Sequence, residues 1–324
     1  MEQQILVPLD GSALAEAVLP PAAALARATG RALTLMRVIG PVIGQDFLGF
    51  PSIRSDAHWM DAVAQARSYL TSIANGLRAT GLPVSFEIEE GKPAERIVTR
   101  IEHDPAISMV AMATHGRSGL QRWVLGSVAE KVLRASSKPL LLVRARENAL
   151  PDRPESTALE RILVPLDGSP FAEQALDEAR RIAAATGATL LLLSVTQSFD
   201  DLLAENEGVS RSRISTFLHD QQAQAIHYLT RVAEQLEGEG FRVMTRVNTG
   251  DPARAILERS ETNQTDLIVM ATHGRGGIQR LWYGSVATRV IQAAQLPVLL
   301  IRAQEPQPIA GEIRQHQQEE PVDV

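Results

Sequence analysis

The sequence predicts two tandem α/β domains, each built on a doubly wound, five-stranded parallel sheet. Three observations lead to this prediction. Blocks of identical sequence recur once at a nearly constant interval, strand-like runs alternate with helix-like stretches, and runs such as ILVPL and TLLLLSV are apolar on both faces. The chain has 324 residues, and at a prior of about 150 residues per domain this length suits two domains.

Three sequence blocks carry the repeat. ILVPLDGS begins at Ile5 and recurs 157 residues later, whereas MATHGR at Met112 and GSVA at Gly126 each recur 158 residues later. One single-residue insertion explains the difference between the two intervals. The repeat therefore indicates duplication and fusion of a whole domain rather than a short-period solenoid.

Composition shifts set the expected domain boundaries. The first domain is expected over residues 1–146 and the second over residues 161–304. Between them, residues 147–160 are polar and contain two prolines, which is typical of a linker. Residues 305–324 are rich in Gln, Glu and Pro, and we expect this tail to be mobile because it can bury little apolar surface.

Local signals place the elements of the first copy. Ser12 can cap a helix that ends at Gly30, Gly81 closes a long helix, and Pro93 precedes another. The expected strands are Ile5–Leu9, Leu33–Val38, Val84–Glu89, Met109–Ala113 and Leu140–Val143, and the expected helices are Ala13–Ala28, Ala57–Ala79, Ala94–Glu102 and Ser127–Ala135.

The second copy repeats this order with one expected difference. Pro20 and Pro21 fall inside the first helix of copy one, whereas copy two has Asp177 and Glu178 there, so we expect an irregular helix in copy one only. The expected strands of copy two are Ile162–Leu166, Thr189–Val195, Arg242–Asn248, Leu267–Ala271 and Val298–Ile301.

Charge and composition exclude several classes of function. A formal net charge of −6 gives no general attraction for nucleic acid or for anionic lipid, so neither is expected as a partner. The chain has no cysteine, which excludes disulfides, thiolate zinc sites and a cysteine nucleophile. No apolar run approaches the ~18 residues of a membrane span, and the sequence begins without a basic leader, so we expect a cytoplasmic protein.

The best-repeated blocks fall at the ends of the first and fourth expected strands. These strands are neighbours where the strand order of a doubly wound sheet reverses, which is where such sheets bind ligands. Asp10 and Asp167 leave the first strand of each copy and are followed by Gly11 and Gly168. A carboxylate there can accept hydrogen bonds from a ribose hydroxyl or an adenine amino group. The alternative is that each aspartate only forms an Asx turn or caps the first helix.

The second block has the spacing of a phosphate-binding loop. It reads A-x2-G-x9-G-S from Ala113 to Ser127 and again from Ala271 to Ser285. Glycine lets the backbone approach a charged group, and the final Gly-Ser opens a helix whose N–H groups and positive dipole end suit a phosphate. The serine hydroxyl can add a donor or simply cap the helix.

Basic side chains lie in the same loop. Arg117 and Arg275 are expected near a phosphate, although solvated surface arginines are the alternative. His115 and His273 are more typical of groups that orient the backbone or pack on a ligand than of catalytic bases, so no catalytic residue is predicted.

Other catalytic motifs are missing. The sequence has no Walker G-x4-G-K-(S/T) motif, no G-x-S-x-G nucleophile elbow and no G-x-G-x-x-G dinucleotide fingerprint after the first strand. No spacing of His and carboxylate residues indicates a metal site, so any Mg²⁺ would arrive bound to phosphates.

These motifs resemble those of tandem universal stress proteins. The resemblance covers a P-x-D after the first strand, a valine that ends the second, and an ATP loop written G-x2-G-x9-G-(S/T); alanine replaces the first glycine in both copies. It implies a Rossmann-like fold of the adenine nucleotide alpha hydrolase type and an ATP site in each copy. The implied site residues are Pro8, Asp10, Val38, Met112, Ala113, His115, Gly116, Arg117, Gly126, Ser127 and Val128, then Pro165, Asp167, Val195, Met270, Ala271, His273, Gly274, Arg275, Gly284, Ser285 and Val286.

Three functions follow as alternatives. The first is a stress-response protein that binds ATP in one or both domains and acts as a sensor or regulatory module. The second is a slow Mg-ATPase that uses the same loops, and the third is a nucleotide-free, chaperone-like scaffold. The resemblance also implies pairing of domains through the fifth strand, here within one chain, and leaves room for a homodimer.

Overall fold

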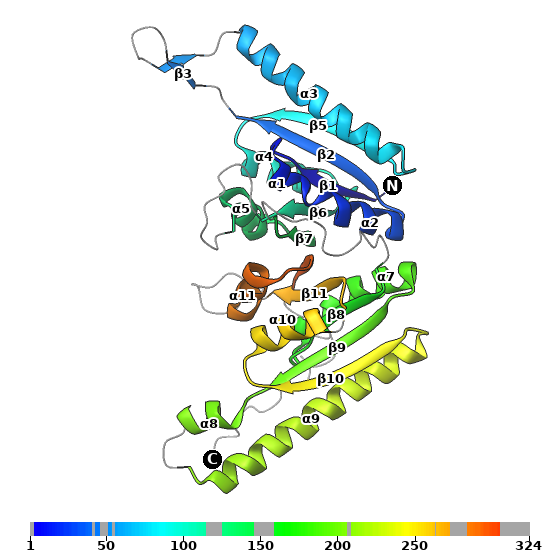
Figure 1. Ribbon diagram of the computed structural model, residues 1–324, viewed down its shortest axis with the longest axis vertical. Coiled ribbons are helices and arrows are strands. Elements are labelled where there is room, and N and C mark those ends of the chain that lie inside the picture. The colour runs from blue at the N-terminus through cyan, green and yellow to red at the C-terminus, as the bar shows by residue number, and fades with distance from the viewer. Residues whose placement is uncertain are drawn as a thin grey trace, which may run out of the picture.

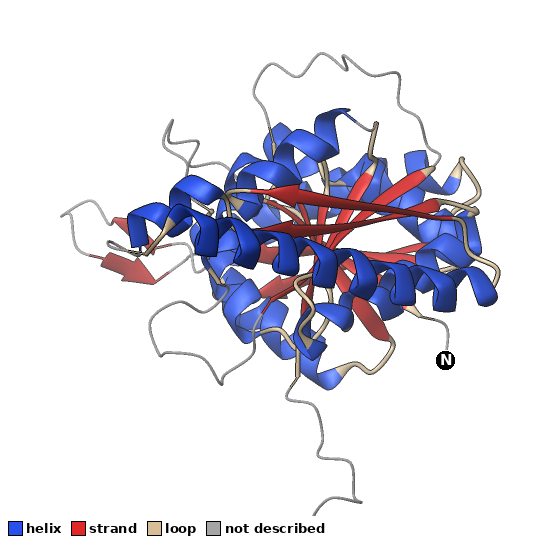
Figure 2. Ribbon diagram, turned by 90° about the horizontal axis from the view of Figure 1, so that it is seen from below, coloured by secondary structure: helices blue, strands red, loops and turns tan. Residues whose placement is uncertain are grey.

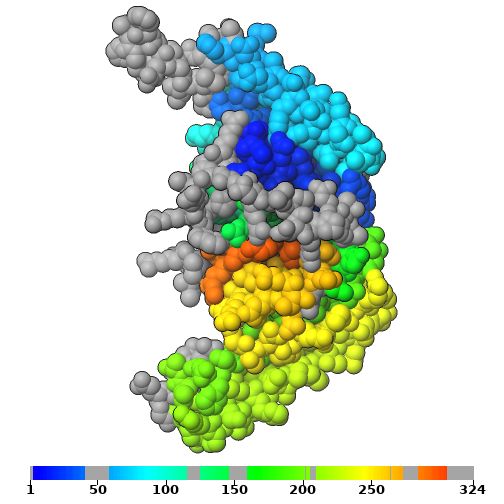
Figure 3. Space-filling view, in the orientation of Figure 1, coloured from blue at the N-terminus to red at the C-terminus, as the bar shows by residue number. Residues whose placement is uncertain are grey.

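The computed structural model describes residues 3–40, 43–45, 51–53, 56–114, 125–145, 159–205, 209–262, 264–272 and 284–304. The expected linker and tail lie almost wholly outside these residues. Figure 3 shows the two copies stacked end to end, with copy one running from blue to green and copy two from green to orange.

Copy one alternates strands and helices. In chain order its elements are β1 (Gln4–Pro8), α1 (Ala13–Glu16), α2 (Leu19–Thr29), β2 (Ala32–Ile39), β3 (Ile43–Gln45), β4 (Pro51–Ile53), α3 (Asp56–Arg78), β5 (Val84–Glu90), α4 (Pro93–His103), β6 (Ile107–Ala113), α5 (Ser127–Ala135) and β7 (Leu140–Val143). Strands β3 and β4 form a separate antiparallel pair.

Copy two repeats the order. Its elements are β8 (Arg161–Pro165), α6 (Pro170–Glu173), α7 (Ala175–Thr186), β9 (Thr189–Thr196), α8 (Phe199–Glu205), α9 (Arg211–Gly238), β10 (Val243–Thr249), α10 (Pro252–Thr262), β11 (Leu267–Thr272), α11 (Ser285–Ala293) and β12 (Val298–Arg302). All ten strands expected from the sequence are present, with ends that differ by no more than two residues.

The main sheet has ten strands in the order β10-β9-β8-β11-β12-β7-β6-β1-β2-β5. Within each copy every strand pair of this main sheet is parallel, and the strand order reverses beside β1 and beside β8. Helices cover both faces of the sheet (Figure 2). The prediction of a doubly wound α/β fold in each copy is confirmed. At the centre, β12 pairs antiparallel with β7, so the two five-stranded sheets are continuous.

Two apolar cores fill the layers on either side of the sheet. One contains residues under α2, α3, α7 and α9, such as Leu70 and Leu236, and the other contains residues under α4, α5, α10 and α11, such as Ile97 and Val290. Each core includes residues of both copies, because the sheet runs through the junction. Among the helices of the described residues, none combines the length and apolar character that crossing a membrane requires.

The first helix is interrupted in both copies, so the expectation of an irregular helix in copy one only is wrong. In copy one, Ala17 and Val18 separate α1 from α2, and in copy two Gln174 separates α6 from α7. Pro20 and Pro21 lie in the first turn of α2, where their missing N–H groups cost no helical hydrogen bond. Because copy two breaks without prolines there, the interruption belongs to the path of the chain and not to proline.

Candidate nucleotide site

A cavity lies at the strand reversal of each copy. Strand β1 lies between β2 and β6, and β8 lies between β9 and β11, so the ends of β1 and β8 adjoin the loops that follow β6 and β11. The sequence predicted this meeting of the two best-repeated blocks. The crevice beyond the carboxyl ends of the strands is where open α/β sheets bind ligands.

The cavity of copy one measures about 260 Å³ and that of copy two about 290 Å³. Copy one is lined by Pro8, Leu9, Asp10, Ala15, Met36, Val38, Pro93, Ile97, Met112, Ala113, Thr114, Gly126, Ser127, Val128 and Ala129. Copy two is lined by Pro165, Leu166, Asp167, Phe171, Ala172, Leu193, Val195, Pro252, Ile256, Met270, Ala271, Thr272, Gly284, Ser285, Val286 and Ala287. Each cavity thus brings together the eight described site residues that were predicted for its copy.

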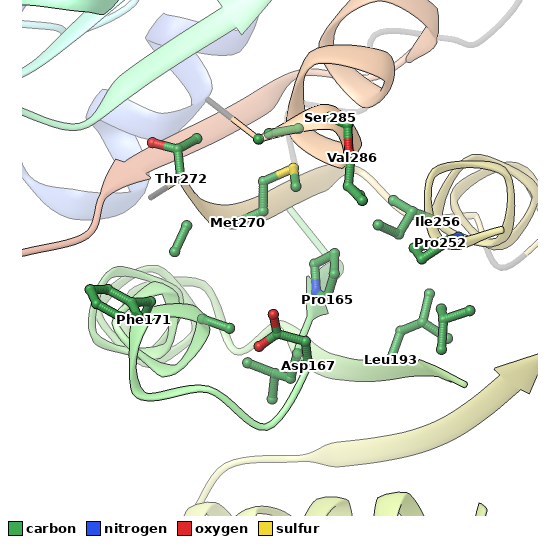
Figure 4. A pocket seen from close by; sticks show the side chains of 16 residues that line it. Pro165, Asp167, Phe171, Leu193, Pro252, Ile256, Met270, Thr272, Ser285 and Val286 are labelled. Atoms are coloured by element: carbon green, nitrogen blue, oxygen red, sulfur yellow. The ribbon is translucent and has the colours of Figure 1, made fainter. Parts of the chain in front are cut away.

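Figure 4 shows how these side chains surround the cavity of copy two. Asp167 reaches it from one side, and Ser285 and Val286, from the start of α11, face it from the opposite side. Pro252 and Ile256 of α10 close a third side. The carboxylate and the helix opening therefore meet the same space, as the sequence predicted.

The aspartates are oriented by the turn that follows each first strand. Asp10 Oδ1 accepts a hydrogen bond from the Ser12 amide at 2.9 Å and another from the Ser12 hydroxyl at 2.5 Å. Asp167 Oδ1 is bound in the same way by Ser169, at 2.9 and 2.6 Å. The Asx turn considered as an alternative is thus present. It does not exclude a ligand, because a carboxylate has about four acceptor positions and both aspartates line the cavities.

Each of the two serines that follow aspartate also caps a helix, as expected of Ser12. The Ser12 hydroxyl accepts from the Ala15 amide at 3.2 Å, and the Ser169 hydroxyl accepts from the Ala172 amide at 3.1 Å. A capped first turn holds the backbone that carries the aspartate in a single conformation. The capped first turns of α1 and α6 therefore fix the positions of the two carboxylates.

The helix openings meet the cavity with their N–H groups. Gly126 and Gly284 are the N-cap residues of α5 and α11, and no described side chain caps either helix. Capping, one of the two roles considered for Ser127 and Ser285, does not occur, because both serines are the first helical residues and both are exposed. The first amides of a helix lack partners within it, and with the helix dipole they favour an anion.

Apolar residues of the second strand and the fourth helix complete each cavity. Met36, Pro93 and Ile97 of copy one were missed, as were Leu193, Pro252 and Ile256 of copy two. A sequence signal existed for the helical pair, since G-x-P-A-x-x-I occurs at Gly91 and again 159 residues later. These side chains give each cavity a mostly apolar wall, which suits a planar base.

A half-buried tyrosine lies near each aspartate and was also missed. Tyr69 of α3 lies near Glu16 and Asp10. Burial raises the pKa of the Tyr69 phenol, and the Glu16 carboxylate raises it further, while the Arg37 guanidinium acts in the opposite direction. In copy two, burial and Glu173 raise the pKa of Tyr228 in the same way. Both phenols therefore keep their protons at neutral pH.

Several predicted residues lie outside the described residues. They are the histidine, glycine and arginine of each loop: His115, Gly116, Arg117, His273, Gly274 and Arg275. Ala113 and Ala271, which replace the first glycine of the family loop, line cavities that stay open, so their methyl groups do not fill the space. In the part of the chain that the structure describes, no group of three or more His, Asp and Glu side chains is arranged to hold a metal ion.

Comparison with known proteins agrees with this geometry. Residues 1–144 and 158–302 each match the universal stress protein family. A universal stress protein of Mycolicibacterium smegmatis is 30% identical over 311 residues, which cover 93% of this chain and 97% of the relative. A second relative, from Mycobacterium tuberculosis, is 29% identical over 207 residues, which cover 64% of this chain and 65% of that protein.

Solved structures share the fold of the whole chain. The crystal structure of a universal stress protein from Archaeoglobus fulgidus superposes with a TM-score of 0.68 at 23% identity, covering 92% of this chain and 98% of that one. A structure from Pseudomonas aeruginosa, described as a putative universal stress protein, gives a TM-score of 0.57 at 18% identity and covers 93% and 94% of the two chains. Two matched domains and a relative aligned over nearly its full length lead to one conclusion: the chain belongs to the universal stress protein family.

Proposed function

We propose that the protein binds an adenine nucleotide, ATP, in both cavities and acts as a cytoplasmic stress-response sensor or regulatory binding module. One observation carries the proposal. In each copy, eight aligned residues from separate segments of the sequence line a single cavity that joins an aspartate to a helix opening. Two cavities with the same lining indicate that the same ligand chemistry is retained in both copies.

The parts of the cavity match the parts of the nucleotide. The apolar wall formed by Val38, Met112 and Ile97 suits the adenine ring. Asp10 can accept hydrogen bonds from ribose hydroxyls. The amides at the start of α5 and the exposed Ser127 hydroxyl suit phosphate oxygens, with any Mg²⁺ carried by the phosphates themselves.

The described cavities are of a size for the nucleoside. At about 260 and 290 Å³ they lie just under the ~300–1,000 Å³ typical of small-molecule sites. The phosphates are therefore assigned to the helix opening and to the glycine loop that leads to it. ATP bound there would join β1, β6 and α5, so binding and loss of ATP would change how firmly these elements are held together. This coupling is the basis for a sensor.

A thermal-shift titration tests the proposal. ATP should stabilise the protein by about 2.7 kcal/mol at a hundredfold excess over Kd. The double variant Asp10→Asn and Asp167→Asn should lose most of this stabilisation, whereas Asp177→Asn, an exposed change on α7, should keep it. Absence of any shift with millimolar ATP, together with no nucleotide released from the purified protein, would favour the nucleotide-free scaffold. Phosphate release that depends on Asp10 and Asp167 would favour the slow ATPase.

We also propose that the two copies pair within one chain in solution. The support is the antiparallel pairing of β12 with β7 and the two apolar cores that continue across it. Light scattering should then give the mass of one chain, or of a dimer built through other surfaces, and cutting the linker should leave the two copies together.

A further inference from the structure

The junction between the copies has local two-fold symmetry. Leu141 of β7 pairs with Leu299 of β12, and these are aligned residues of the two copies, 158 positions apart. Their neighbours pair reciprocally, since Leu140 faces Leu300 and Leu142 faces Val298. Any two copies of this domain can make the same backbone ladder. Strand pairing alone therefore does not decide whether copy one binds copy two or binds the N-terminal domain of another molecule.

An ion pair beside the junction breaks this symmetry. Helices α2 and α7 pack against each other across the junction (Figure 1). There, Arg31 Nη2 of copy one lies 2.8 Å from Glu178 Oε1 of copy two, with only 5% and 4% of the two side chains exposed. The second Glu178 oxygen accepts from Arg181 Nη1 at 2.9 Å, while Arg31 Nε donates to Gln3 at a longer 3.4 Å.

The two-fold-related position carries no charge. Copy two has Ala188 where copy one has Arg31, and copy one has Pro21 where copy two has Glu178. Ala188 is buried, with 3% of its surface exposed. The ion pair therefore occurs on one side of the symmetry axis only, and it needs one member from each copy.

Pairing of like copies would leave these charges without partners. Two copies of the first domain, joined through β7, would place each Arg31 opposite Pro21. Two copies of the second domain, joined through β12, would place each Glu178 opposite Ala188. A buried charge without a partner is strongly unfavourable. Within the described residues, Arg31 Nη1 is already buried without a hydrogen-bond partner, so this side chain depends on Glu178 for compensation.

We propose that the Arg31–Glu178 pair determines which domains pair at the junction. It favours pairing of copy one with copy two and disfavours pairing of two N-terminal domains with each other. The partner it selects is the complementary domain, from the same chain or from another copy of this chain. The inference rests on the proposed pairing of the two copies and is independent of nucleotide binding. Buried ion pairs often add little affinity over apolar side chains, so discrimination between partners is the expected contribution.

Exchange between cut chains tests the proposal. A protease site is inserted between Leu150 and Pro151 of the full chain, and the folded protein is cut. Equal amounts of isotope-labelled and unlabelled cut protein are mixed under mild denaturant until the labels have exchanged. Native mass spectrometry then counts the mixed pairs, which contain one N-terminal and one C-terminal fragment, and the like pairs, which contain two N-terminal or two C-terminal fragments. The wild type should give pairs of one N-terminal and one C-terminal fragment almost alone.

The decisive variant is the double change Arg31→Met and Glu178→Met. It should still form the mixed pair, but the fraction of like pairs should rise at least about tenfold, a change in relative free energy of about 1.4 kcal/mol. The matched control is Arg254→Met with Glu258→Met, which removes an exposed ion pair within α10. This control should give the wild-type distribution.

Three results would overturn the proposal. Frequent like pairs in the wild type would refute the role of Arg31 and Glu178. So would a double methionine variant in which like pairs remain rare. Complete separation of the fragments in the wild type would refute the pairing of the copies itself. The two failures are distinguished by whether any fragment pairs are seen, and neither depends on whether ATP binds.

Discussion

The amide of Gly126 donates a 2.7 Å hydrogen bond to the carbonyl oxygen of Thr114, so the loop after β6 returns to its starting point where α5 begins. The aligned glycines that open the two helices differ in backbone conformation. Gly126 has φ −55°, whereas Gly284 has φ +71°. The same helix-opening position is thus held by an ordinary backbone in copy one and by one that only glycine adopts readily in copy two.

Alanine should therefore be tolerated at Gly126 and not at Gly284. We expect Gly284→Ala to lower the free energy of unfolding by about 1–3 kcal/mol, since a side chain at positive φ is strained. Gly126→Ala should cost less than about 1 kcal/mol, the loss of a favourable N-cap residue. No atom lies within 4 Å of a Cβ built at Gly284, so the cost is conformational. Urea unfolding measures both values, and equal losses would contradict this explanation.

Each cavity should account for one nucleotide. Asp10→Asn should reduce the number of ATP sites measured by calorimetry from two to one, and so should Asp167→Asn, because each removes one of the carboxylates. Asparagine can still accept a hydrogen bond from the following serine, so the turn and the fold should survive. The exposed Asp177→Asn variant should keep both sites. Unchanged stoichiometry in both single variants would rule out the aspartates as nucleotide ligands.

The ion pair at the junction predicts an unequal response to its two single substitutions. Glu178→Met leaves Arg31 buried without a carboxylate, and we expect a loss of about 3–5 kcal/mol. Arg31→Met should cost less, because Glu178 keeps Arg181 at 2.9 Å. The double variant should recover most of the loss. Unfolding of all four proteins in urea gives the coupling energy, and strictly additive losses would show that the two side chains do not interact.

Acid should remove the contribution of Asp104, which ends α4. Arg100 Nη1 lies 2.5 Å from one Asp104 oxygen and the Ala106 amide donates to the other at 2.8 Å. Arg100 and then Ala106 hold the pKa of Asp104 below its ordinary value. The stabilisation is therefore present above the unfolded pKa of about 3.9 and is lost as the pH falls through the folded pKa. Asp104→Asn should cost about 1 kcal/mol at pH 7. Its urea midpoint should converge with that of the wild type in acid; a gap that stays constant with pH would contradict this origin.

The fold could be predicted from the sequence because the domain repeat and the local helix and strand signals indicate the same elements. Helix α5 and strand β7 have the predicted ends, since Gly126 precedes the helix and Pro139 precedes the strand. The meeting of Asp10 with Gly126 followed from one topological rule, that ligand sites lie where the strand order reverses. Because the repeated blocks keep the same order and spacing, the same rule places strands one and four side by side in both copies.

What the sequence did not predict depends on contacts between distant segments. Tyr69 comes to Asp10 only because α3 folds back over β2 and β5, and no local pattern marks that approach. The interruption of the first helix was assigned to proline, yet copy two breaks at Gln174 without one. Arg31 and Glu178 looked like ordinary charged residues, because they meet only where the two copies are joined.

Joining the copies through β7 and β12 also removes a hazard. A strand at the edge of a sheet exposes unpaired backbone groups that can recruit another chain. Two separate domains would carry four such edges, whereas the ten-stranded sheet keeps two, at β5 and β10. Strand β5 bears Glu87, Glu89 and Glu90, and β10 bears Arg246, and charge at an edge opposes further strand addition. The continuous sheet thus leaves fewer edges at which another chain could add a strand.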